Sequence, residues 1–418
     1  MAVLMLLGGS NGQLSAARRI KAMGHQVILA DYYKDPPAAA VCDAHAQVST
    51  FDAEACIQAA KEYGVNGVLT LGTDQPVYTA ALVAKALGLP SPILVETAVK
   101  ATNKRAMKEA FLRCGVPCVP FAFLREGQGP EALSALTAPL VVKPLDSQGQ
   151  RGVFKVSTPE EAVSRLPETL SFSREREALA ESFYLSDEVT LSCFVWEGQV
   201  YPLTLTDRQL MNDPVHIGVC AAHRYPSVHT GREKEISKIA SLVARALGVR
   251  AGPLYIQLLV GKDGILVNEA ACRIGGAFED AFIPYVTGFD ILNAAIRLAL
   301  GEAPDLSALD HLSPESGSTQ ISVQMLFCRP GQIASMTPLE QVLKMPGMLT
   351  AGYNYGVGST LPVLQNATAR FGHCVLATRQ GDMAEKVKAL YRFLRVTDPT
   401  GNNLVISRTY DGKEETDA

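Results

Sequence analysis

The sequence lacks the features that mark several large classes of protein. Its nine cysteines include no C-x-x-C pair, and Cys193, Cys220 and Cys328 lie in apolar runs, which indicates buried thiols rather than disulfides or a zinc site. A net charge of −4 gives no electrostatic basis for binding nucleic acid or an anionic membrane. No apolar stretch is long enough to cross a membrane, and the run Val3–Leu7 has no basic flank. We therefore expect a cytoplasmic protein without a signal sequence.

The composition supports a chain with a sizeable core. Apolar residues make up 47% and charged residues 19%, and a length of 418 residues suggests two to four domains. Residues 1–95 alternate short apolar strands with helices, beginning with a strand over Val3–Leu7 and a helix over Gln13–Met23. This alternation predicts a parallel sheet with crossover helices.

A glycine turn, Gly8–Gly12, joins the first strand to the first helix, and Asp31 follows about twenty residues later, as in many dinucleotide sites. However, the glycines run G-G-x-x-G rather than G-x-G-x-x-G. We therefore favour a role in the turn and in helix packing, or contact with a substrate other than a dinucleotide. A nicotinamide dehydrogenase stays an alternative.

Two lysines stand where they could meet an anion. Lys104 lies in a helix predicted over Thr97–Cys114, and Lys143 lies in a strand over Pro139–Pro144. A lysine on a central strand resists burial unless an anion meets it. The glycine-bearing loop Asp146–Gly152 could lay backbone N–H groups on phosphate oxygens. The alternative for Lys143 is an edge position from which it reaches water.

The segment Tyr255–Ala277 predicts a hairpin with polar residues where packing does not need them. Gln257 lies in the first strand, Asn268 and Glu269 close the second, and Arg273 follows. Gln257 and Glu269 could present oxygen atoms side by side, which suits a hard cation such as Mg²⁺. The alternative is an ordinary hairpin with a polar edge.

The segments that remain complete the pattern. Leu179–Ser192 carries two glutamates around an apolar run and could bind a purine edge and ribose hydroxyls, or could be a solvated strand and turn. Met211–Ser227 resembles a substrate loop. Helices are predicted over Gly231–Leu247 and Ile283–Leu300, and the residues from about 310 onward form an α+β unit without a catalytic constellation.

Taken in order, these motifs resemble the ATP-grasp superfamily. The matching segments are NK (103–104), VVKP (141–144), ESFYLSDE (181–188) and NEAACR (268–273). The first unit is similar to the domain that precedes the ATP-grasp fold in biotin carboxylase, carbamoyl-phosphate synthase and carboxylate–amine ligases. The resemblance covers roughly residues 1–310. It implies an α/β and α+β protein with a parallel α/β domain (1–95), an ATP-grasp nucleotide-binding region (96–310) with a mobile lid at about 140–190, and a C-terminal α+β portion (311–418).

The resemblance also implies roles for individual residues. Lys104 and Lys143 would bind the ATP phosphates, and Gly149 and Gly152 would belong to the mobile loop that covers them. Glu181 would contact the adenine amino group and Glu188 the ribose, with the backbone of Ser182 and Tyr184 between them. Gln257 and Glu269 would hold Mg²⁺, with Mn²⁺ as an alternative ion. Arg273, catalytic together with Lys143, would lie against the substrate carboxylate or acyl phosphate.

A softer match to the amino-acid ligase branch adds Arg208, His223 and Gly275 as substrate residues. It implies small-molecule carboxylate and amine substrates, of amino-acid or peptide type, and leaves a homodimer open. Two departures from the family pattern matter. Gln257 replaces the more usual glutamate, as in carbamoyl-phosphate synthase, and Ala271 replaces the asparagine of E-x-N-x-R, which puts a second metal ion in doubt.

The implied reaction makes an acyl phosphate from a carboxylate and ATP, after which an amine displaces phosphate. Two alternatives keep the fold but change the chemistry: a reaction of the carbamoyl-phosphate type, and biotin carboxylation, although the chain has no biotin-carrier motif. A further alternative is a nucleotide-binding sensor whose catalysis has lapsed, which Ala271 keeps open.

Overall fold

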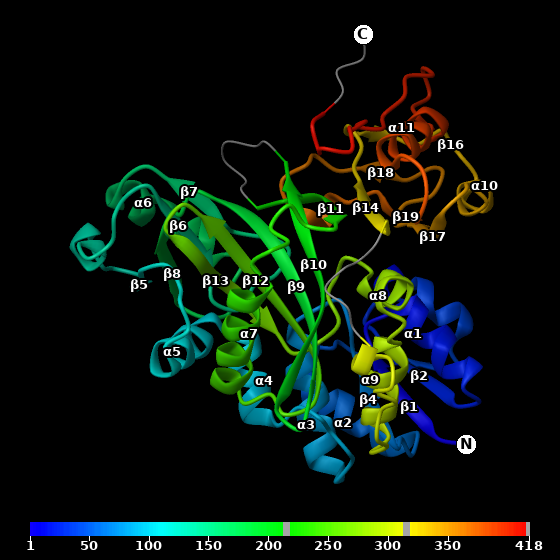
Figure 1. The fold of residues 1–418 in the computed structure, drawn as a ribbon, viewed down its shortest axis with the longest axis horizontal. Coiled ribbons are helices and arrows are strands. Elements are labelled where there is room, and N and C mark those ends of the chain that lie inside the picture. The colour runs from blue at the N-terminus through cyan, green and yellow to red at the C-terminus, as the bar shows by residue number, and fades with distance from the viewer. Residues whose placement is uncertain (212–217, 312–317, 415–418) are drawn as a thin grey trace.

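The N-terminal unit is a small parallel sheet with crossover helices. The computed structural model describes residues 1–211, 218–311 and 318–414. The elements of this unit are β1 (Val3–Leu7), α1 (Asn11–Ala22), β2 (Gln26–Ala30), β3 (Ala44–Ala46), α2 (Ala53–Glu62), β4 (Gly67–Leu69) and α3 (Gln75–Leu87). The strand order is β3-β2-β1-β4 with parallel pairing throughout (Figure 1). The predicted parallel α/β architecture is confirmed.

The glycine turn after β1 serves the fold. Ser10 caps α1, and its side chain and that of Gln13 form a reciprocal capping box. A Cβ atom on Gly9 would lie 2.8 Å from Pro36, so glycine is needed there. The Asp31 carboxylate accepts hydrogen bonds from the N–H groups of Gly9 (2.7 Å) and Tyr33 (2.8 Å). The carboxylate that a ribose would need is thus used by the turn.

The next region begins with two helices rather than one. α4 (Val95–Thr102) and α5 (Lys104–Cys114) are separated at Asn103, so the prediction of a single helix over Thr97–Cys114 is wrong. The Asn103 backbone is extended, and its side chain accepts a hydrogen bond from the Ala106 N–H, which makes it the N-cap of α5. Lys104 is therefore the first residue of a helix.

A large antiparallel sheet forms the centre of the molecule (Figure 1). Its strand order is β13-β12-β9-β10-β11-β14-β19-β17. In chain order these strands are β9 (Ser186–Trp196), β10 (Gln199–Leu210), β11 (Cys220–Tyr225), β12 (Gly252–Gly261), β13 (Gly264–Ala271), β14 (Gln320–Leu326), β17 (Met348–Tyr353) and β19 (Gly372–Thr378). Helix α7 (Glu233–Leu247) packs its apolar face, including Ile236 and Val243, against this sheet and α5. The hairpin predicted over Tyr255–Ala277 is the pair β12 and β13.

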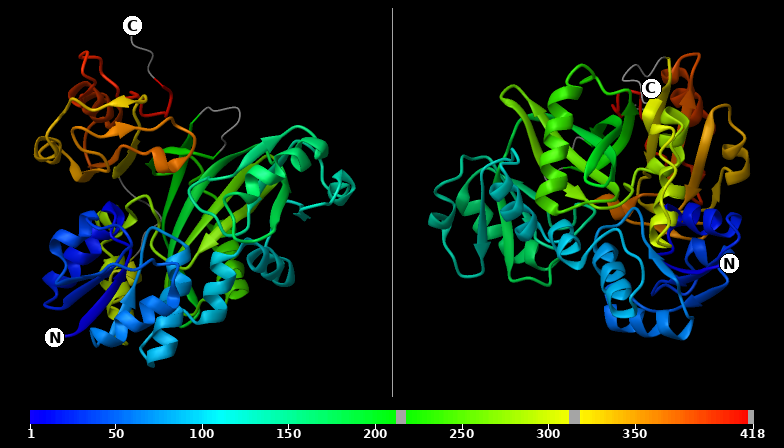
Figure 2. Two further views of the ribbon diagram at one scale, coloured as in Figure 1. Left: turned by 180° about the vertical axis from the view of Figure 1, so that it is seen from behind. Right: turned by 60° about the horizontal axis from the view of Figure 1, so that its bottom comes forward.

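A second antiparallel sheet projects to one side of the large one (Figure 2). Its strand order is β5-β8-β6-β7, with β5 (Phe121–Arg125), β6 (Leu140–Pro144), β7 (Phe154–Val156) and β8 (Glu177–Ser182). Helix α6 (Pro159–Leu170) covers it through a separate small core that includes Leu124, Val142 and Leu166. The proposed lid, about residues 140–190, falls largely within this unit.

The C-terminal portion continues the large sheet, because β11 pairs with β14 across the two parts. Helices α8 (Glu279–Thr287) and α9 (Ile291–Ala299) precede it; the single helix predicted over Ile283–Leu300 is wrong because Gly288 ends α8 in the left-handed region (φ 75°). α8 contacts β17 and β19, while α9 contacts α1 and β4. The remaining elements are β15 (Gly331–Gln332), β16 (Ser335–Met336), α10 (Leu339–Leu343), β18 (Thr360–Leu361), α11 (Met383–Phe393) and β20 (Val396–Thr397).

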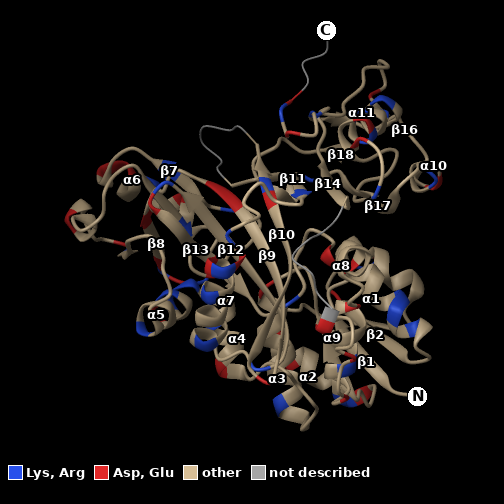
Figure 3. Ribbon diagram, viewed as in Figure 1, with Lys and Arg blue, Asp and Glu red and all other residues tan. Residues whose placement is uncertain are grey.

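Charged residues of both signs are mixed over all parts of the ribbon (Figure 3). None of the described helices is long and apolar enough to span a membrane.

Candidate nucleotide and substrate site

The candidate site is a cavity of about 260 Å³ between the large sheet and the sheet β5-β8-β6-β7. All the residues implied to bind ATP line it except Gly152: Lys104, Lys143, Gly149, Glu181, Ser182, Tyr184 and Glu188. The apolar side chains of Val119, Val141, Phe183, Leu210 and Leu259 complete its wall. A cavity with an apolar wall and cations at one side suits a ligand with a flat aromatic part and an anionic part.

Glu181 is the centre of a buried ion network inside this cavity. Its carboxylate pairs with the Lys108 ammonium at 2.6 Å and with the Lys143 ammonium. The three side chains are at most 9% exposed. Burial alone would raise the pKa of Glu181, but the two ammonium groups outweigh it and lower the pKa to about 2. Glu181 therefore stays ionised and holds Lys143 in place.

Lys143 and Lys104 differ in how their charge is supported. Burial lowers the pKa of both lysines. For Lys143 the nearby carboxylates of Glu181 and Glu269 more than offset burial, and the net pKa is raised. For Lys104 burial wins over the attraction of Glu269, and the net pKa is lowered. Among the described residues the Lys104 ammonium donates a hydrogen bond to the Ser147 carbonyl alone, at 2.9 Å, so an arriving anion would stabilise its charge.

The metal hairpin contains a β-bulge that sequence reasoning did not reveal. Gln257 of β12 lies opposite Glu269 of β13, whereas Leu258 lies opposite Val267, so Asn268 is the extra residue. In a regular strand Asn268 and Glu269 would point to opposite faces. Here both line the same cavity. Gln257 and Glu269 thus pair across adjacent strands as predicted, but Glu269 lines the cavity and Gln257 does not.

The two amide side chains of this hairpin, Gln257 and Asn268, are engaged in hydrogen bonds. The Gln257 amide donates to the Tyr255 hydroxyl (2.9 Å) and accepts from the Asn268 amide (3.2 Å), which fixes its orientation. Asn268 in turn accepts a hydrogen bond from Lys143 at 3.1 Å. The described residues contain no group of three or more His, Cys, Asp and Glu side chains arranged to hold a metal ion. Ala271 is buried and offers no side-chain oxygen.

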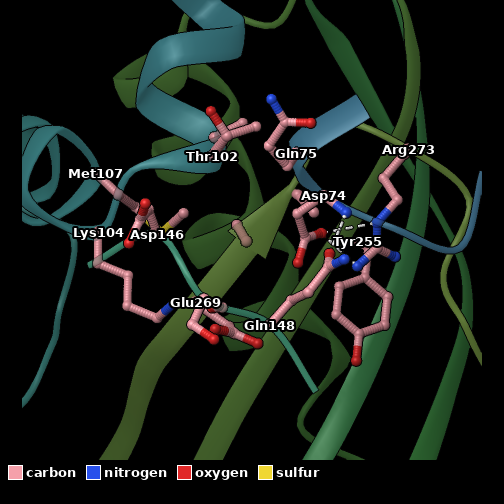
Figure 4. A pocket seen from close by; sticks show the side chains of 14 residues that line it. Asp74, Gln75, Thr102, Lys104, Met107, Asp146, Gln148, Tyr255, Glu269 and Arg273 are labelled. Atoms are coloured by element: carbon pink, nitrogen blue, oxygen red, sulfur yellow. Dashed lines mark hydrogen bonds and ion pairs between the residues drawn. The ribbon is translucent and has the colours of Figure 1, made fainter. Parts of the chain in front are cut away.

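A second, smaller cavity adjoins the first, and Figure 4 shows its lining side chains. Lys104, Gln148 and Glu269 line both cavities, whereas Arg273 and Tyr255 line only the smaller one. The Arg273 guanidinium donates to the Asp74 carboxylate through two nitrogens, at 2.5 and 2.8 Å. Its carbon also lies 5.0 Å from the centre of the Tyr255 ring. These contacts hold Arg273 in the smaller cavity, whereas Lys143 lines the larger one.

The glycine loop is tied to both neighbouring parts of the chain. The Gln148 side chain accepts a hydrogen bond from the Asp74 N–H (2.9 Å), and the Gly149 carbonyl accepts one from the Ala367 N–H (3.2 Å). Gly149 and Gly152 have φ near +70°, which favours glycine. Gly152 faces away from the cavity, where an added Cβ would lie 2.8 Å from Phe172. The structure thus places Gly149 at the site and Gly152 in the packing beside it.

Two of the residues proposed to bind substrate, Arg208 and His223, lie opposite each other on the neighbouring strands β10 and β11. Arg208 donates to Glu188 at 3.1 Å and to the Tyr255 hydroxyl at 3.0 Å. His223, opposite Arg208 in the sheet, shares a hydrogen bond with Thr206. Burial, together with Arg208 and Arg370, lowers the pKa of His223, so the ring is neutral. The Met211–Ser227 segment contains the strand β11; its residues 212–217 lie outside the described part.

Gly275 makes room for a carboxylate that sequence reasoning did not single out. An added Cβ on Gly275 would lie 1.9 Å from Oε1 of Glu279, the first residue of α8. Glu279 is 1% exposed, and its Oε2 accepts a hydrogen bond from the Ala277 N–H at 2.9 Å. Burial raises the pKa of Glu279 to about 7, against the opposing effects of its own backbone N–H and Arg273. The sequence signal that could have revealed Glu279 is an acidic residue three positions after the pair Gly275-Gly276.

Sequence reasoning also missed Lys108, Asp74 and Arg370. Lys108 lies one helical turn after Lys104 on α5, so a second buried lysine on that face could have been suspected. Asp74 is about 200 residues from its partner Arg273, and Arg370 comes from the part in which no catalytic residues were expected. No local signal marks either of them.

Glu279 makes a pH prediction possible. Its folded-state pKa of about 7 is above its ordinary value, so its contribution to stability is fully present below about pH 4.5 and is lost as the pH rises through 7. Glu279→Gln is neutral at every pH and is expected to be more stable than the parent at pH 8 by about 2 kcal/mol, with little difference at pH 5. Urea unfolding at the two pH values measures this. Exposed Glu340→Gln is the control, and an equal difference at both pH values would contradict the expectation.

No protein-family model matches the chain. An L-arginine-specific L-amino acid ligase of Bacillus subtilis is 22% identical over 328 residues, which is 72% of this chain and 74% of that protein. A D-alanine–D-alanine ligase of Flavobacterium psychrophilum is 29% identical over 140 residues, 32% of this chain and 39% of that one.

Solved structures are similar over nearly the whole chain. The crystal structure of an L-amino acid ligase from Bacillus licheniformis has a TM-score of 0.78 at 20% identity and covers 95% of this chain and 99% of its own. A phosphoribosylglycinamide synthetase from Anaerococcus prevotii has a TM-score of 0.75 at 17% identity with the same coverage. At these identities the likeness establishes the fold, and it confirms the fold that the motifs implied.

Proposed function

With the ATP-grasp fold as its framework, we propose that the protein is an ATP-dependent ligase that activates a carboxylate as an acyl phosphate and joins it to an amine. The observation that carries the proposal is the junction of the two cavities. Lys104 and Glu269 line both, Lys143 lies in the larger cavity, and Arg273 lies in the smaller one. Cations and an oxygen ligand thus stand where a triphosphate in the larger cavity would meet a carboxylate in the smaller.

The larger cavity suits the nucleotide. The base fits between the apolar side chains Val141 and Leu259, next to the linker Ser182–Tyr184. The phosphates fit toward Lys143 and Lys104, under Gly149 of the glycine loop. Because Lys143 is held by Glu181 and Asn268, its ammonium is positioned before the nucleotide arrives, which lowers the reorganisation that binding requires.

Mg²⁺, where bound, would neutralise charge between the transferring phosphoryl group and its leaving group. Glu269 and the carbonyl oxygen of Gln257 would hold it. Gln257 is presented by its hydrogen bonds to Tyr255 and Asn268, and Glu269 faces Lys104 and Lys143 from the bulge. Mn²⁺ would fit the same oxygen atoms.

The reaction needs positive charge at two points. A carboxylate oxygen attacks the γ-phosphorus of ATP, the bond to the β-phosphate oxygen breaks, and ADP leaves. Lys104, with its lowered pKa, gains most from meeting the transferring group. Arg273, fixed by Asp74, would orient the carboxylate and later the acyl phosphate. An amine nitrogen then attacks the acyl carbon, and inorganic phosphate leaves.

The amino-acid character of the substrates is the finer part of the proposal. Support comes from the named specificity of the Bacillus subtilis relative and from the Bacillus licheniformis structure, both L-amino acid ligases. Arg273 lines the smaller cavity, Arg208 donates a hydrogen bond to Tyr255 in its wall, and Glu279 interacts electrostatically with Arg273. These are the kind of charges that amino and carboxylate groups require.

A phosphate-release screen tests the function. The protein is incubated with ATP, Mg²⁺ and pairs drawn from the common amino acids and small carboxylates. We expect phosphate and ADP to form in equal amounts, and only when both a carboxylate and an amine are present. Tight ATP binding without turnover for any pair would favour the second candidate, a nucleotide-binding protein without catalysis. The observation that supports this candidate is Ala271, which stands where a metal ligand is expected.

A further inference from the structure

Two of the buried polar atoms that have no hydrogen-bond partner within the described chain belong to side chains of opposite charge that interact with each other electrostatically. One is Oε1 of Glu279, at the start of α8, and the other is Nε of Arg370, in the C-terminal portion. Buried polar atoms are almost always bonded, so a pair of opposite charge left open calls for a ligand. Neither residue belongs to the motifs that define the nucleotide site.

Arg370 differs from the other arginines near the site. Arg208 has Glu188 as its carboxylate partner, and Arg273 has Asp74. Among the described residues no carboxylate forms an ion pair with Arg370. Its neighbours are instead another cation, Arg208, the thiol of Cys220 and, at longer range, Glu279. Burial and Arg208 lower its pKa, which means that an anion arriving there would be stabilised.

The surroundings of Arg370 contain further side chains that stay neutral. His373 on β19 stacks on Phe278 with ring centres 3.5 Å apart, and burial together with Arg370 lowers its pKa to about 3. His223 on β11 is neutral for a similar reason. The backbone of Arg370 is fixed, since its carbonyl accepts a hydrogen bond from the Asn354 side chain and its N–H donates to Ala367. Arg370 is therefore a cation on a fixed stretch of backbone, and no described carboxylate forms an ion pair with it.

Glu279 connects this cation to the proposed reaction centre. Its carboxylate lies against Gly275 and interacts electrostatically with Arg273, Tyr255 and Arg370. It is the first residue of α8, six residues after Arg273. A molecule that reached from Glu279 to Arg370 would thus have one end close to the acyl group that Arg273 orients.

We propose that Glu279 and Arg370 bind the amine substrate, a zwitterion of the α-amino acid type, with its ammonium group on Glu279 and its carboxylate on Arg370. This inference rests on the ligase function proposed above. Only a ligand with both charges satisfies both open atoms, because a simple carboxylate would leave Glu279 without a partner and a simple amine would leave Arg370 without one.

The same placement gives Glu279 a role in the second half of the reaction. An ammonium nitrogen has no lone pair, so it must lose a proton before it attacks the acyl carbon. The Glu279 carboxylate takes that proton, the nitrogen forms the new C–N bond, and the bond from the acyl carbon to the phosphate oxygen breaks. The proton then passes to the departing phosphate or to water, which restores the carboxylate.

Hydroxylamine separates the two halves of the reaction. It carries no carboxylate, is largely uncharged at neutral pH, and traps an acyl phosphate as a hydroxamate. The experiment measures coupling to amino acids and hydroxamate formation in parallel, with ATP and Mg²⁺, for the parent, Arg370→Gln and Glu279→Gln. Exposed Arg392→Gln, on α11 of the same portion, is the matched control.

In Arg370→Gln we expect the KM for the amine substrate to rise about 100-fold while the rate of hydroxamate formation stays at the value of the parent, since a buried charge-assisted pair is lost. The parent should prefer free amino acids to their carboxamides by a similar factor, and Arg370→Gln should lose that preference. In Glu279→Gln the ratio of amino-acid coupling to hydroxamate formation should fall about 100-fold through kcat. Arg392→Gln should match the parent in every ratio.

The results that would overturn the inference are equally specific. An unchanged preference for free amino acids over carboxamides in Arg370→Gln would show that Arg370 does not bind the amine's carboxylate. A rise in the KM for the activated carboxylate in the hydroxylamine reaction would place Arg370 on the other substrate. If the parent forms no hydroxamate from any carboxylate, the ligase function itself has failed, a different outcome from either of these.

Discussion

Glu269→Gln is expected to lower the turnover of ATP with carboxylate and amine about 10³-fold, while the affinity for the nucleotide changes by less than about tenfold. Glu269 lines both cavities together with Lys104, and it faces Lys143 as well. A neutral amide would leave the proposed metal with amide oxygens only, which are weak partners for a hard cation. Phosphate release measures turnover, and calorimetric titration measures nucleotide affinity.

Asp263→Asn, in the exposed turn of the same hairpin, is the matched control and should behave as the parent. It removes a carboxylate from the hairpin without touching either cavity. If Glu269→Gln keeps full activity, the hairpin does not hold the metal ion. If it loses nucleotide affinity as strongly as turnover, Glu269 acts in binding rather than in the transfer step.

Much of the fold could be predicted because its signals are local. The alternation of strand and helix at the start, the hairpin around Lys262–Gly264 and the amphipathic pattern of α7 each lie within a short window. The two wrong helices share one cause. Asn103 and Gly288 interrupt segments that remain apolar-periodic on both sides, and a capping side chain or a left-handed glycine stops a helix without changing that pattern.

The candidate site could be predicted only where its residues belong to motifs. Lys104, Lys143, Glu181 and Glu269 were found in this way, and the structure brings them to one cavity. The bulge at Asn268 escaped because one extra residue in a strand has no reliable sequence signature, although it decides which side chains point into the cavity.

Partners that come from distant parts of the chain were beyond reach for a different reason. Asp74 meets Arg273, and the Gly149 carbonyl meets Ala367, only because the N-terminal unit, the glycine loop and the C-terminal portion pack together. Arg370 belongs to the same class. Its significance follows from the absence of a counterion among the described residues, which a sequence cannot show.

Glu181→Ala is expected to destabilise the folded protein by about 3–5 kcal/mol. The substitution leaves the ammonium groups of Lys108 and Lys143 buried without their carboxylate, and the cost of a stranded buried charge exceeds the gain of the original pair. Urea unfolding monitored by circular dichroism measures the free energy of unfolding. Because the folded-state pKa of Glu181 is about 2, its contribution is present above about pH 4.5 and is lost as the pH falls toward 2.

Glu177→Ala, on the same strand, provides the comparison that isolates burial. Glu177 also pairs with two cations, Arg105 and Arg125, but their side chains are 32% and 68% exposed, so its removal should cost only about 1 kcal/mol. The double variant Glu181→Ala/Lys108→Met removes one of the stranded charges and should recover part of the loss. If Glu181→Ala costs no more than Glu177→Ala, the buried network does not hold Lys143, and the positioned ammonium on which phosphate binding depends must be explained in another way.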